Sequence, residues 1–282
     1  MIRGYIRRYL KKLTSAIYGW IHVLCIYVCV GRRFLRWRVQ LWRQRFDGVE
    51  STQTDMKQML LIVRHGQTTW NVENRLPGQL PGVALTDVGR QQVARLAEAL
   101  TVLPISTIVS SPLERARDTA EIIAKGRDLA VQFEPDLMDT DIGNWAGQVI
   151  SELSKNDPAW KAYVHDPTVA PEGVETFPQV QQRVVAAVER WRKQENIGAY
   201  PVFVAHADVV KLLIAHYTSL EPVKAGSIHI DNASVSLVEI EDEQAPHVVA
   251  IGWSPSPGWL KAPTPEILKK SDKAQEEGEQ KT

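Results

Sequence analysis

Six short runs of apolar or β-branched residues alternate with longer amphipathic stretches along the middle of this chain. Short apolar runs are typical of strands buried on both faces of a sheet, and stretches 87–101 and 178–195 space their apolar residues as one helix face does. This alternation predicts an α/β fold, a three-layer sandwich in which helices cover both faces of a mixed, mostly parallel sheet. The predicted strands are 58–63, 105–109, 130–133, 201–205, 234–240 and 247–252.

A further helix is expected to begin at Ser111. Serine is a favoured N-cap, Pro112 fits the first helical position, and Glu114 completes a capping box. Gly126 follows as a residue that can end this helix.

Charge is distributed unevenly along the chain, although its formal net charge is zero. Residues 1–50 carry 11 Lys or Arg against 2 Asp or Glu, and the remaining residues carry 22 against 31. Cys25 and Cys29 both lie in the basic part, so the rest has neither a disulfide framework nor cysteine ligands for zinc. An acidic globular part, and a basic part interrupted by apolar residues, argue against a nucleic acid partner.

Residues 13–30 carry no formal charge and are flanked by basic residues on both sides. This run is at the short end for a membrane-spanning helix, which needs about 20 residues, but its flanks favour an anionic lipid surface. We expect residues 1–45 to be an anchor to a membrane surface, with the catalytic part cytoplasmic because basic residues are densest in 32–45. A non-native N-terminal extension is the alternative, and a cleaved signal peptide is disfavoured because no small-x-small site follows.

The chain is expected to divide into three segments. Residues 1–55 form the extension and a polar linker, residues 56–260 form the catalytic domain, and residues 261–282 form a disordered polar tail. Within the domain, residues 155–178 predict a helical excursion and a loop over the sheet edge, the kind of segment that often sets substrate choice.

The triplet Arg64-His65-Gly66 directly follows the first predicted strand. Ligands of such sheets collect at the carboxyl ends of strands. A neutral imidazole is a nucleophile near pH 7, and a guanidinium fork matches phosphate oxygens. Glycine permits an unusual backbone angle and a close approach, and Asn71 adds a second phosphate donor.

His206 ends another strand-like run and precedes a helical one. Two strand-end histidines in one sheet can meet at a common crevice, and Arg115 would direct its charge there from the first turn of its helix. Read singly, His206 is a capping or buried histidine, and Arg115 is a surface residue paired with Asp118 or Glu121.

Five sequence blocks in a fixed order carry a family resemblance that covers about residues 58–252. They are Arg64-His65-Gly66-Gln67-Thr68-x-x-Asn71, Leu85-Thr86-x-x-Gly89-Arg90-x-Gln92, Ser110-Ser111-Pro112-Leu113-x-Arg115-Ala116-x-x-Thr119-Ala120, Gly143-x-Trp145-x-Gly147 and Ala205-His206. Together they resemble the histidine phosphatase superfamily, in its phosphoglycerate-mutase-like branch.

The resemblance implies a role for each matching residue. His65 matches the histidine that becomes phosphorylated, and His206 works with it, best in its protonated form. The residues implied to contact the phosphoryl oxygens are Arg64, Asn71, Arg115 and His206, with Gln67 and Thr68 as further candidates from the first block. The chemistry that the resemblance implies needs neither a cofactor nor a metal.

The acid of the family lies in a Leu-x-Glu step, which reads Leu137-Met138-Asp139 here. We favour Asp139 as the proton donor and keep Asp141 as the alternative, because residues 139 and 141 of an extended segment share a face. An aspartate reaches about 1.5 Å less far than a glutamate, and a general acid must come within about 3 Å of the leaving oxygen.

Two further departures from the family pattern are Ala207, where glycine is usual, and Ala146, where an acidic residue is common. Glu175 lies in a turn before the predicted helix 178–195, and we expect it to be structural.

The leading hypothesis is a phosphomonoester hydrolase that acts through a phosphohistidine on a small phosphorylated metabolite such as a sugar phosphate, a phosphoglycerate or a nucleotide-loop phosphate. The alternative is a phosphoglycerate-type phosphomutase, which needs extra cations for a substrate carboxylate. Lys155, Lys161 and Arg183 are the sparse candidates for that role. A weakly active or inactive phosphate-binding scaffold is the third reading, motivated by the aspartate at the acid position and by Ala207.

Overall fold

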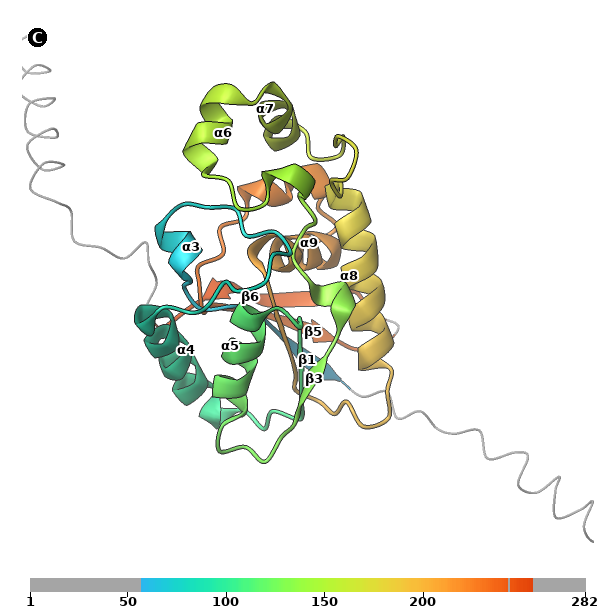
Figure 1. Ribbon diagram of the computed structural model, residues 1–282. Helices are drawn as coiled ribbons and strands as arrows, with labels where there is room; N and C mark the ends of the chain where they lie inside the picture. Colours follow the sequence, from blue (N-terminus) through green and yellow to red (C-terminus); the bar gives the residue numbers. More distant parts are fainter. Residues whose placement is uncertain (1–56, 243, 256–282) are drawn as a thin grey trace, which may run out of the picture. The chain divides into compact units, whose positions relative to one another are not determined.

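One six-stranded sheet forms the centre of the part of the chain that the computed structural model describes, residues 57–242 and 244–255 (Figure 1). The strand order is β3-β2-β4-β1-β5-β6. Strands β3, β2, β4 and β1 run parallel to one another, whereas β5 is antiparallel to both β1 and β6. The predicted fold class is confirmed, and every predicted strand has a counterpart. The strands are β1 Gln58–Arg64, β2 Thr107–Ser110, β3 Val131–Phe133, β4 Pro201–Ala205, β5 Val235–Ile240 and β6 His247–Trp253.

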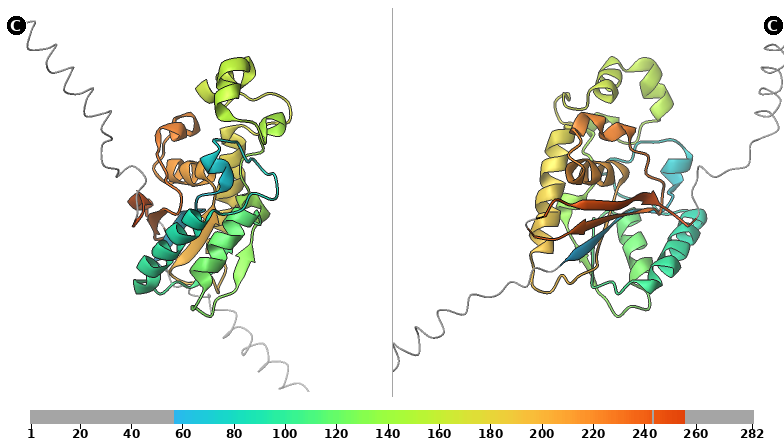
Figure 2. Two further views of the ribbon diagram at one scale, coloured as in Figure 1. Left: turned by 60° about the vertical axis from the view of Figure 1, so that its left-hand side comes forward. Right: turned by 180° about the vertical axis from the view of Figure 1, so that it is seen from behind.

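Helices cover both faces of this sheet, α4 and α5 on one side and α8 and α9 on the other (Figures 1 and 2). Strand β1 shows why its sequence is apolar throughout: Leu61 and Val63 join the core beneath α4 and α5, and Leu60 and Ile62 join the opposite core. The helices are α3 Thr69–Val72, α4 Asp87–Ala99, α5 Glu114–Ala124, α6 Ile150–Asn156, α7 Pro158–His165, α8 Phe177–Arg192 and α9 Ala207–Tyr217. Short 3₁₀ turns are η1 Leu100–Val102, η2 Pro135–Leu137, η3 Gly143–Trp145 and η4 Pro222–Ser227.

The predicted start of α5 is wrong by two residues, because the N-cap is Leu113 and not Ser111. The helix begins at Glu114, and its N-cap is Leu113, which makes no side-chain capping bond. The Ser111 side chain instead contacts His206. The end of the helix agrees with the prediction, because Gly126 follows it with a φ of 80°, a left-handed conformation that favours glycine.

The predicted helical excursion consists of α6, α7 and the loop that leads to α8 (Figure 1). Trp145, Trp160 and Tyr163 pack together there, with the rings of Trp145 and Trp160 centred 5.1 Å apart in an edge-on arrangement. This aromatic cluster joins the core beneath α8 and α9 and so attaches the excursion to the domain.

The predictions for residues 1–55 and 261–282, including the membrane anchor, lie outside the described residues. Within 57–242 and 244–255, no helix is both long enough and apolar enough to cross a membrane.

Candidate active site

Three neighbouring parallel strands place their C-terminal residues together at one end of the sheet. His65 follows β1, His206 follows β4 between β1 and β2, and Ser111 follows β2. The two imidazole rings lie 5.3 Å apart between centroids, at an angle of 59°. His206 has no exposed surface and His65 has 3%. The structure thus brings together the two histidines that the sequence placed at strand ends.

The His65 ring is held by the backbone beside it. Its Nδ1 lies 2.7 Å from the carbonyl oxygen of Gly66. A carbonyl accepts only, so Nδ1 carries the proton and Nε2 retains the lone pair of a nucleophile. The carbonyl of His65 itself accepts hydrogen bonds from the Ala233 N–H and from Asn232 Nδ2.

Gly66 is required for close approach rather than for an unusual φ. It is absent from the glycines with positive φ among the described residues. A Cβ at this position would lie 2.7 Å from Val93 Cγ2 and 2.8 Å from the Gly89 carbonyl oxygen, both on α4. The turn that carries His65 therefore packs directly against the backbone of α4.

Arg64 and Arg115 bring buried guanidinium groups with unused donors. Arg64 Nη1 donates to the Ile230 carbonyl at 2.6 Å, and Arg115 Nη2 donates to the Gly78 carbonyl at 2.7 Å. Arg64 Nε, Arg115 Nε and Arg115 Nη1 are buried without a hydrogen-bond partner in the described protein, as is Nδ1 of His206. Buried polar groups are nearly always hydrogen-bonded, so these four nitrogens suit an anion. Arg115 is fully buried and not a surface residue paired with Asp118 or Glu121.

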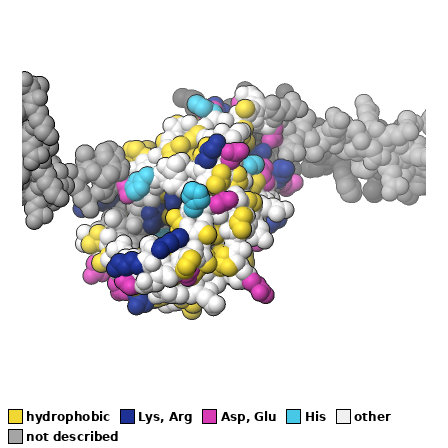
Figure 3. Space-filling view, turned by 90° about the horizontal axis from the view of Figure 1, so that it is seen from above, with side chains coloured by type: hydrophobic (Ala, Val, Ile, Leu, Met, Phe, Trp, Pro, Cys, Tyr) yellow, Lys and Arg dark blue, Asp and Glu magenta, His cyan; other side chains and the backbone are white. Residues whose placement is uncertain are grey.

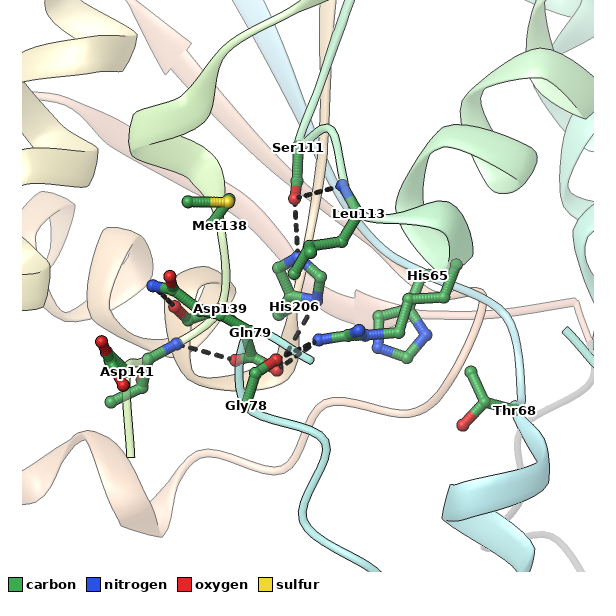
Figure 4. Close-up of polar contacts among 12 residues, drawn as sticks. His65, Thr68, Gly78, Gln79, Ser111, Leu113, Met138, Asp139, Asp141 and His206 are labelled. Carbon is green, nitrogen blue, oxygen red and sulfur yellow. Dashed lines mark hydrogen bonds and ion pairs between the residues drawn. The ribbon is translucent and has the colours of Figure 1, made fainter. Parts of the chain in front are cut away.

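Asp139 and Asp141 differ in their surroundings (Figure 4). Asp139 Oδ2 accepts from Arg115 Nη2 at 3.0 Å and lies 3.6 Å from His206 Nδ1, which is too long for a hydrogen bond. Asp141 is exposed, and its Oδ1 accepts from the Gly143 N–H. The two carboxylates therefore do not share one environment: that of Asp139 faces the guanidinium of Arg115, and that of Asp141 is exposed.

A framework of hydrogen bonds holds the Asp139 backbone in place. Its carbonyl oxygen accepts from Gln79 Nε2 at 2.9 Å and from Arg183 Nη2 at 3.0 Å. Arg183 also donates to the carbonyls of Asp136 and Met138 and pairs with the Glu175 carboxylate. Glu175 thus makes structural contacts here, as we expected.

Burial shifts the pKa values of the central groups in a consistent direction. Burial, followed by the charges of Arg115 and Arg64, holds the pKa of His65 well below 6.5. Burial, Arg115 and His65 do the same for the pKa of His206. Burial raises the pKa of Asp139 above 3.8, and Arg115 opposes this rise. The environment of the site therefore disfavours charge on both imidazoles and shifts the carboxyl toward its protonated form.

The other residues predicted to contact phosphate make hydrogen bonds around α3 and α4. Asn71 Oδ1 accepts from the Thr68 N–H and from Asn232 Nδ2, which leaves its own Nδ2 as a donor. The Thr68 hydroxyl caps α3, and Thr68 lies apart from the cluster around His206 (Figure 4). Gln67 Oε1 accepts from the Thr86 hydroxyl at the start of α4.

Sequence reasoning missed three residues that support the site. Ser111 was assigned to a helix cap, Asn232 lies in no recognisable motif, and Arg183 was considered only as a substrate cation. For Ser111 a signal existed, because it also belongs to one of the family blocks. For Asn232 the sequence offers none, since only the fold brings it to His65.

Comparisons with known proteins agree with this geometry. The sequence model of the histidine phosphatase superfamily (branch 1) matches residues 60–253, so the chain belongs to this superfamily. The probable phosphoglycerate mutase GpmB of Shigella boydii is 33% identical over 195 residues, 68% of this chain and 88% of that protein.

Solved structures that resemble this fold include phosphatases. The mycobacterial glucosyl-3-phosphoglycerate phosphatase, solved in complex with VO3, has a TM-score of 0.63 and 29% identity over 71% of this chain and 100% of that one. A putative α-ribazole-5′-P phosphatase from Escherichia coli has a TM-score of 0.62 and 26% identity over 69% of this chain and 95% of that one.

Proposed function

We propose that this protein is a phosphomonoester hydrolase that transfers the phosphoryl group of a small metabolite to His65 and then to water. The observation that carries the proposal is the convergence of a neutral, oriented His65 with unpartnered buried donors of Arg64, Arg115 and His206. Such donors are preorganised for the negative charge that spreads over phosphoryl oxygens in a loose transition state.

The first half of the reaction forms the phosphohistidine. The lone pair of His65 Nε2 attacks phosphorus while the bond from phosphorus to the leaving oxygen breaks. The Asp139 carboxyl, whose pKa is raised by burial, donates its proton to that oxygen from its protonated form and becomes a carboxylate.

The second half regenerates the enzyme. The Asp139 carboxylate accepts a proton from water as the water oxygen attacks phosphorus, and the bond to Nε2 breaks to release inorganic phosphate. The aspartate reaches the pocket despite its short side chain, because Arg115 and the bonded backbone place its carboxylate beside His206. This reach supports an enzyme over a phosphate-binding scaffold.

The cations of the candidate loop support hydrolysis over phosphoryl return to a phosphoglycerate. The Arg183 guanidinium donates to the Glu175 carboxylate and to three backbone carbonyls. Lys161 Nζ donates to the Lys155 carbonyl, and Lys155 pairs with Glu152. None of the three is held ready for a substrate carboxylate. Seen from the end that carries α6 and α7, acidic, basic and apolar side chains are mixed, with no continuous basic patch on that face (Figure 3).

The similarity to a probable phosphoglycerate mutase makes mutase activity the second candidate. Incubation with 3-phosphoglycerate separates the two: the hydrolase releases inorganic phosphate without forming 2-phosphoglycerate, and efficient interconversion would contradict our proposal. A panel of phosphomonoesters, covering sugar phosphates and phosphoglycerates, then identifies the substrate.

The matched variants for this panel are His65→Ala and His247→Ala. His65→Ala should abolish phosphate release and the acid-labile phosphoenzyme, whereas His247→Ala, at an exposed position of β6, should keep both. Unchanged phosphate release by His65→Ala would rule out a phosphohistidine on this residue.

A further inference from the structure

Ser111 lies directly against the second histidine of the site. Its Oγ is 2.9 Å from Nε2 of His206, and neither residue has exposed surface (Figure 4). The Leu113 N–H also donates to this oxygen, at 3.4 Å. The hydroxyl therefore belongs to a small buried network with His206 Nε2 and the Leu113 N–H.

The hydrogen bonds of this network distinguish the two neutral forms of His206. A hydroxyl has one hydrogen to donate and two lone pairs. If the Ser111 hydroxyl donates to Nε2, one lone pair accepts from Leu113 and every hydrogen of the network is used. If Nε2 carries the proton instead, both lone pairs accept, and the buried Ser111 hydrogen has no acceptor among the described residues.

The other ring nitrogen gives the same preference. His206 Nδ1 is buried without a hydrogen-bond partner and lies 3.6 Å from Asp139 Oδ2. Asp139 Oδ2 accepts a hydrogen bond from Arg115 Nη2, so an N–H on Nδ1 faces an acceptor oxygen favourably, whereas a lone pair on Nδ1 would face another lone pair. Nε and Nη1 of Arg115, which also lack a hydrogen-bond partner in the described protein, are buried in the same site.

We propose that Ser111 is a positioning residue that holds His206 in its Nδ1–H form, so that a neutral imidazole donates a hydrogen bond to a phosphoryl oxygen. This inference rests on the proposed function. It explains how a pocket that already holds two buried guanidinium groups gains a further donor without a third charge. The lowered pKa of His206 agrees with a neutral ring.

The test measures the proton directly. Long-range ¹H–¹⁵N NMR spectra of protein labelled with ¹⁵N-histidine at pH 7 report which ring nitrogen carries the hydrogen. The chain has seven histidines, and the signals missing from the His206→Gln spectrum identify those of His206. We expect a neutral ring protonated on Nδ1. A ring protonated on Nε2, or on both nitrogens, in the wild-type protein would overturn the inference.

Variants test the role of the hydroxyl. Ser111→Ala should give a mixture of the two neutral forms and lower kcat/KM by about 10- to 100-fold, as loss of a group that orients a functional histidine does. Ser111→Thr keeps the hydroxyl and should keep the Nδ1–H form. Ser110→Ala is the matched control: Ser110 is buried next in the chain, but its hydroxyl donates to the Ser111 carbonyl.

The possible outcomes remain distinct. A Ser111→Ala variant that loses activity while His206 stays on Nδ1–H would assign Ser111 a packing role and overturn the inference. The wild-type spectrum depends neither on turnover nor on the Ser111 variants, so it tests the inference even if Ser111→Ala does not fold. A protein with the expected His206 form that releases no phosphate from any monoester would contradict the proposed function and not the hydrogen-bond assignment.

Discussion

Arg115 Nη2 donates a hydrogen bond to Asp139 Oδ2 across the candidate active site, at 3.0 Å. The same guanidinium has two unpartnered nitrogens, Nε and Nη1, that suit the phosphoryl group. One side chain thus links the proposed acid to the proposed phosphate site. Asp139 needs this contact because its side chain is short, and Arg115 limits how far burial raises the pKa of the carboxyl.

The proton donor can be identified by comparing two neighbouring variants. Asp139→Asn should lower kcat by about 10²- to 10⁴-fold for alkyl phosphates, the usual contribution of general acid catalysis. The loss should be smaller for p-nitrophenyl phosphate, whose leaving group needs little protonation. Asp141→Asn is the matched control, since Asp141 is exposed and bonds to Gly143. A larger loss in Asp141→Asn than in Asp139→Asn would reverse the assignment.

The pH profile of kcat/KM should have two limbs with different origins. His65 attacks when neutral, and its pKa lies well below 6.5, so activity should fall only when the pH drops well below 6.5. Asp139 donates when protonated, and its pKa lies above 3.8, so activity should fall as the pH rises through that raised pKa.

Asp139→Asn tests this profile, because it should remove the alkaline limb and leave the acid limb. Steady-state rates at constant ionic strength provide the measurement. An alkaline limb that persists in Asp139→Asn belongs to another group and would contradict the assignment.

The buried imidazoles should make stability depend on pH. The folded pKa of His206 lies below the unfolded value of about 6.5, so below that pH the unfolded chain binds a proton that the folded chain does not. Stability is therefore lost as the pH falls below 6.5, by at most about 1.4 kcal/mol per pH unit for one imidazole.

Asp139 acts in the opposite direction, because its raised pKa removes stability as the pH rises from about 4. The comparison is therefore made in the Asp139→Asn background, with urea unfolding between pH 5 and pH 7.5. Adding His206→Asn should flatten the loss of stability on the acid side, and adding the exposed control His247→Asn should not. If the free energy of unfolding depends on pH with the same slope in both variants, His206 does not gain a proton on unfolding.

Alanine substitutions at two glycines test the close approach between the His65 turn and α4. Gly66→Ala should destabilise the fold by about 1–3 kcal/mol, because the new methyl group would overlap Val93 and the Gly89 carbonyl. It should also lower kcat, since the overlap displaces His65. Gly226→Ala is the control, because a Cβ there meets nothing within 4 Å. Urea unfolding compares the two, and equal effects would show that the α4 contact is unimportant.

The sequence predicted the sheet and the meeting of the candidate site residues because both depend on short-range patterns. Buried strands read as apolar runs, and residues that follow parallel strands must collect at one end of a sheet. His65 and His206, which follow β1 and β4, therefore lie side by side, and Arg115 on α5 is buried in the same site.

The details of the site depend on contacts between distant segments, which a single sequence does not reveal. Ser111 has a favourable capping pattern, but its hydroxyl contacts His206 and the helix begins at Glu114. The sequence favoured Asp139 over Asp141 only through the family pattern, because the contacts of their segment with Arg183 on α8 join residues that lie far apart in the chain.

Variants of Arg183 can show whether this side chain positions the Asp139 segment or binds substrate. Its guanidinium makes bonds to Glu175 and to the carbonyls of Asp136, Met138 and Asp139, a geometry that lysine cannot reproduce. Arg183→Lys should therefore let the Asp139 segment shift and lower kcat by about 10- to 100-fold, with little change in KM.

Glu175→Gln completes this experiment, because it weakens the same ion pair from the other side. If Arg183 only positions the segment, both variants should lower kcat and leave KM for phosphoglycerates unchanged. If Arg183 instead binds a substrate carboxylate, Glu175→Gln should release the guanidinium and lower KM, whereas Arg183→Lys should raise it. Opposite changes in KM would favour the mutase reading, since a cation for the carboxylate is what that activity requires.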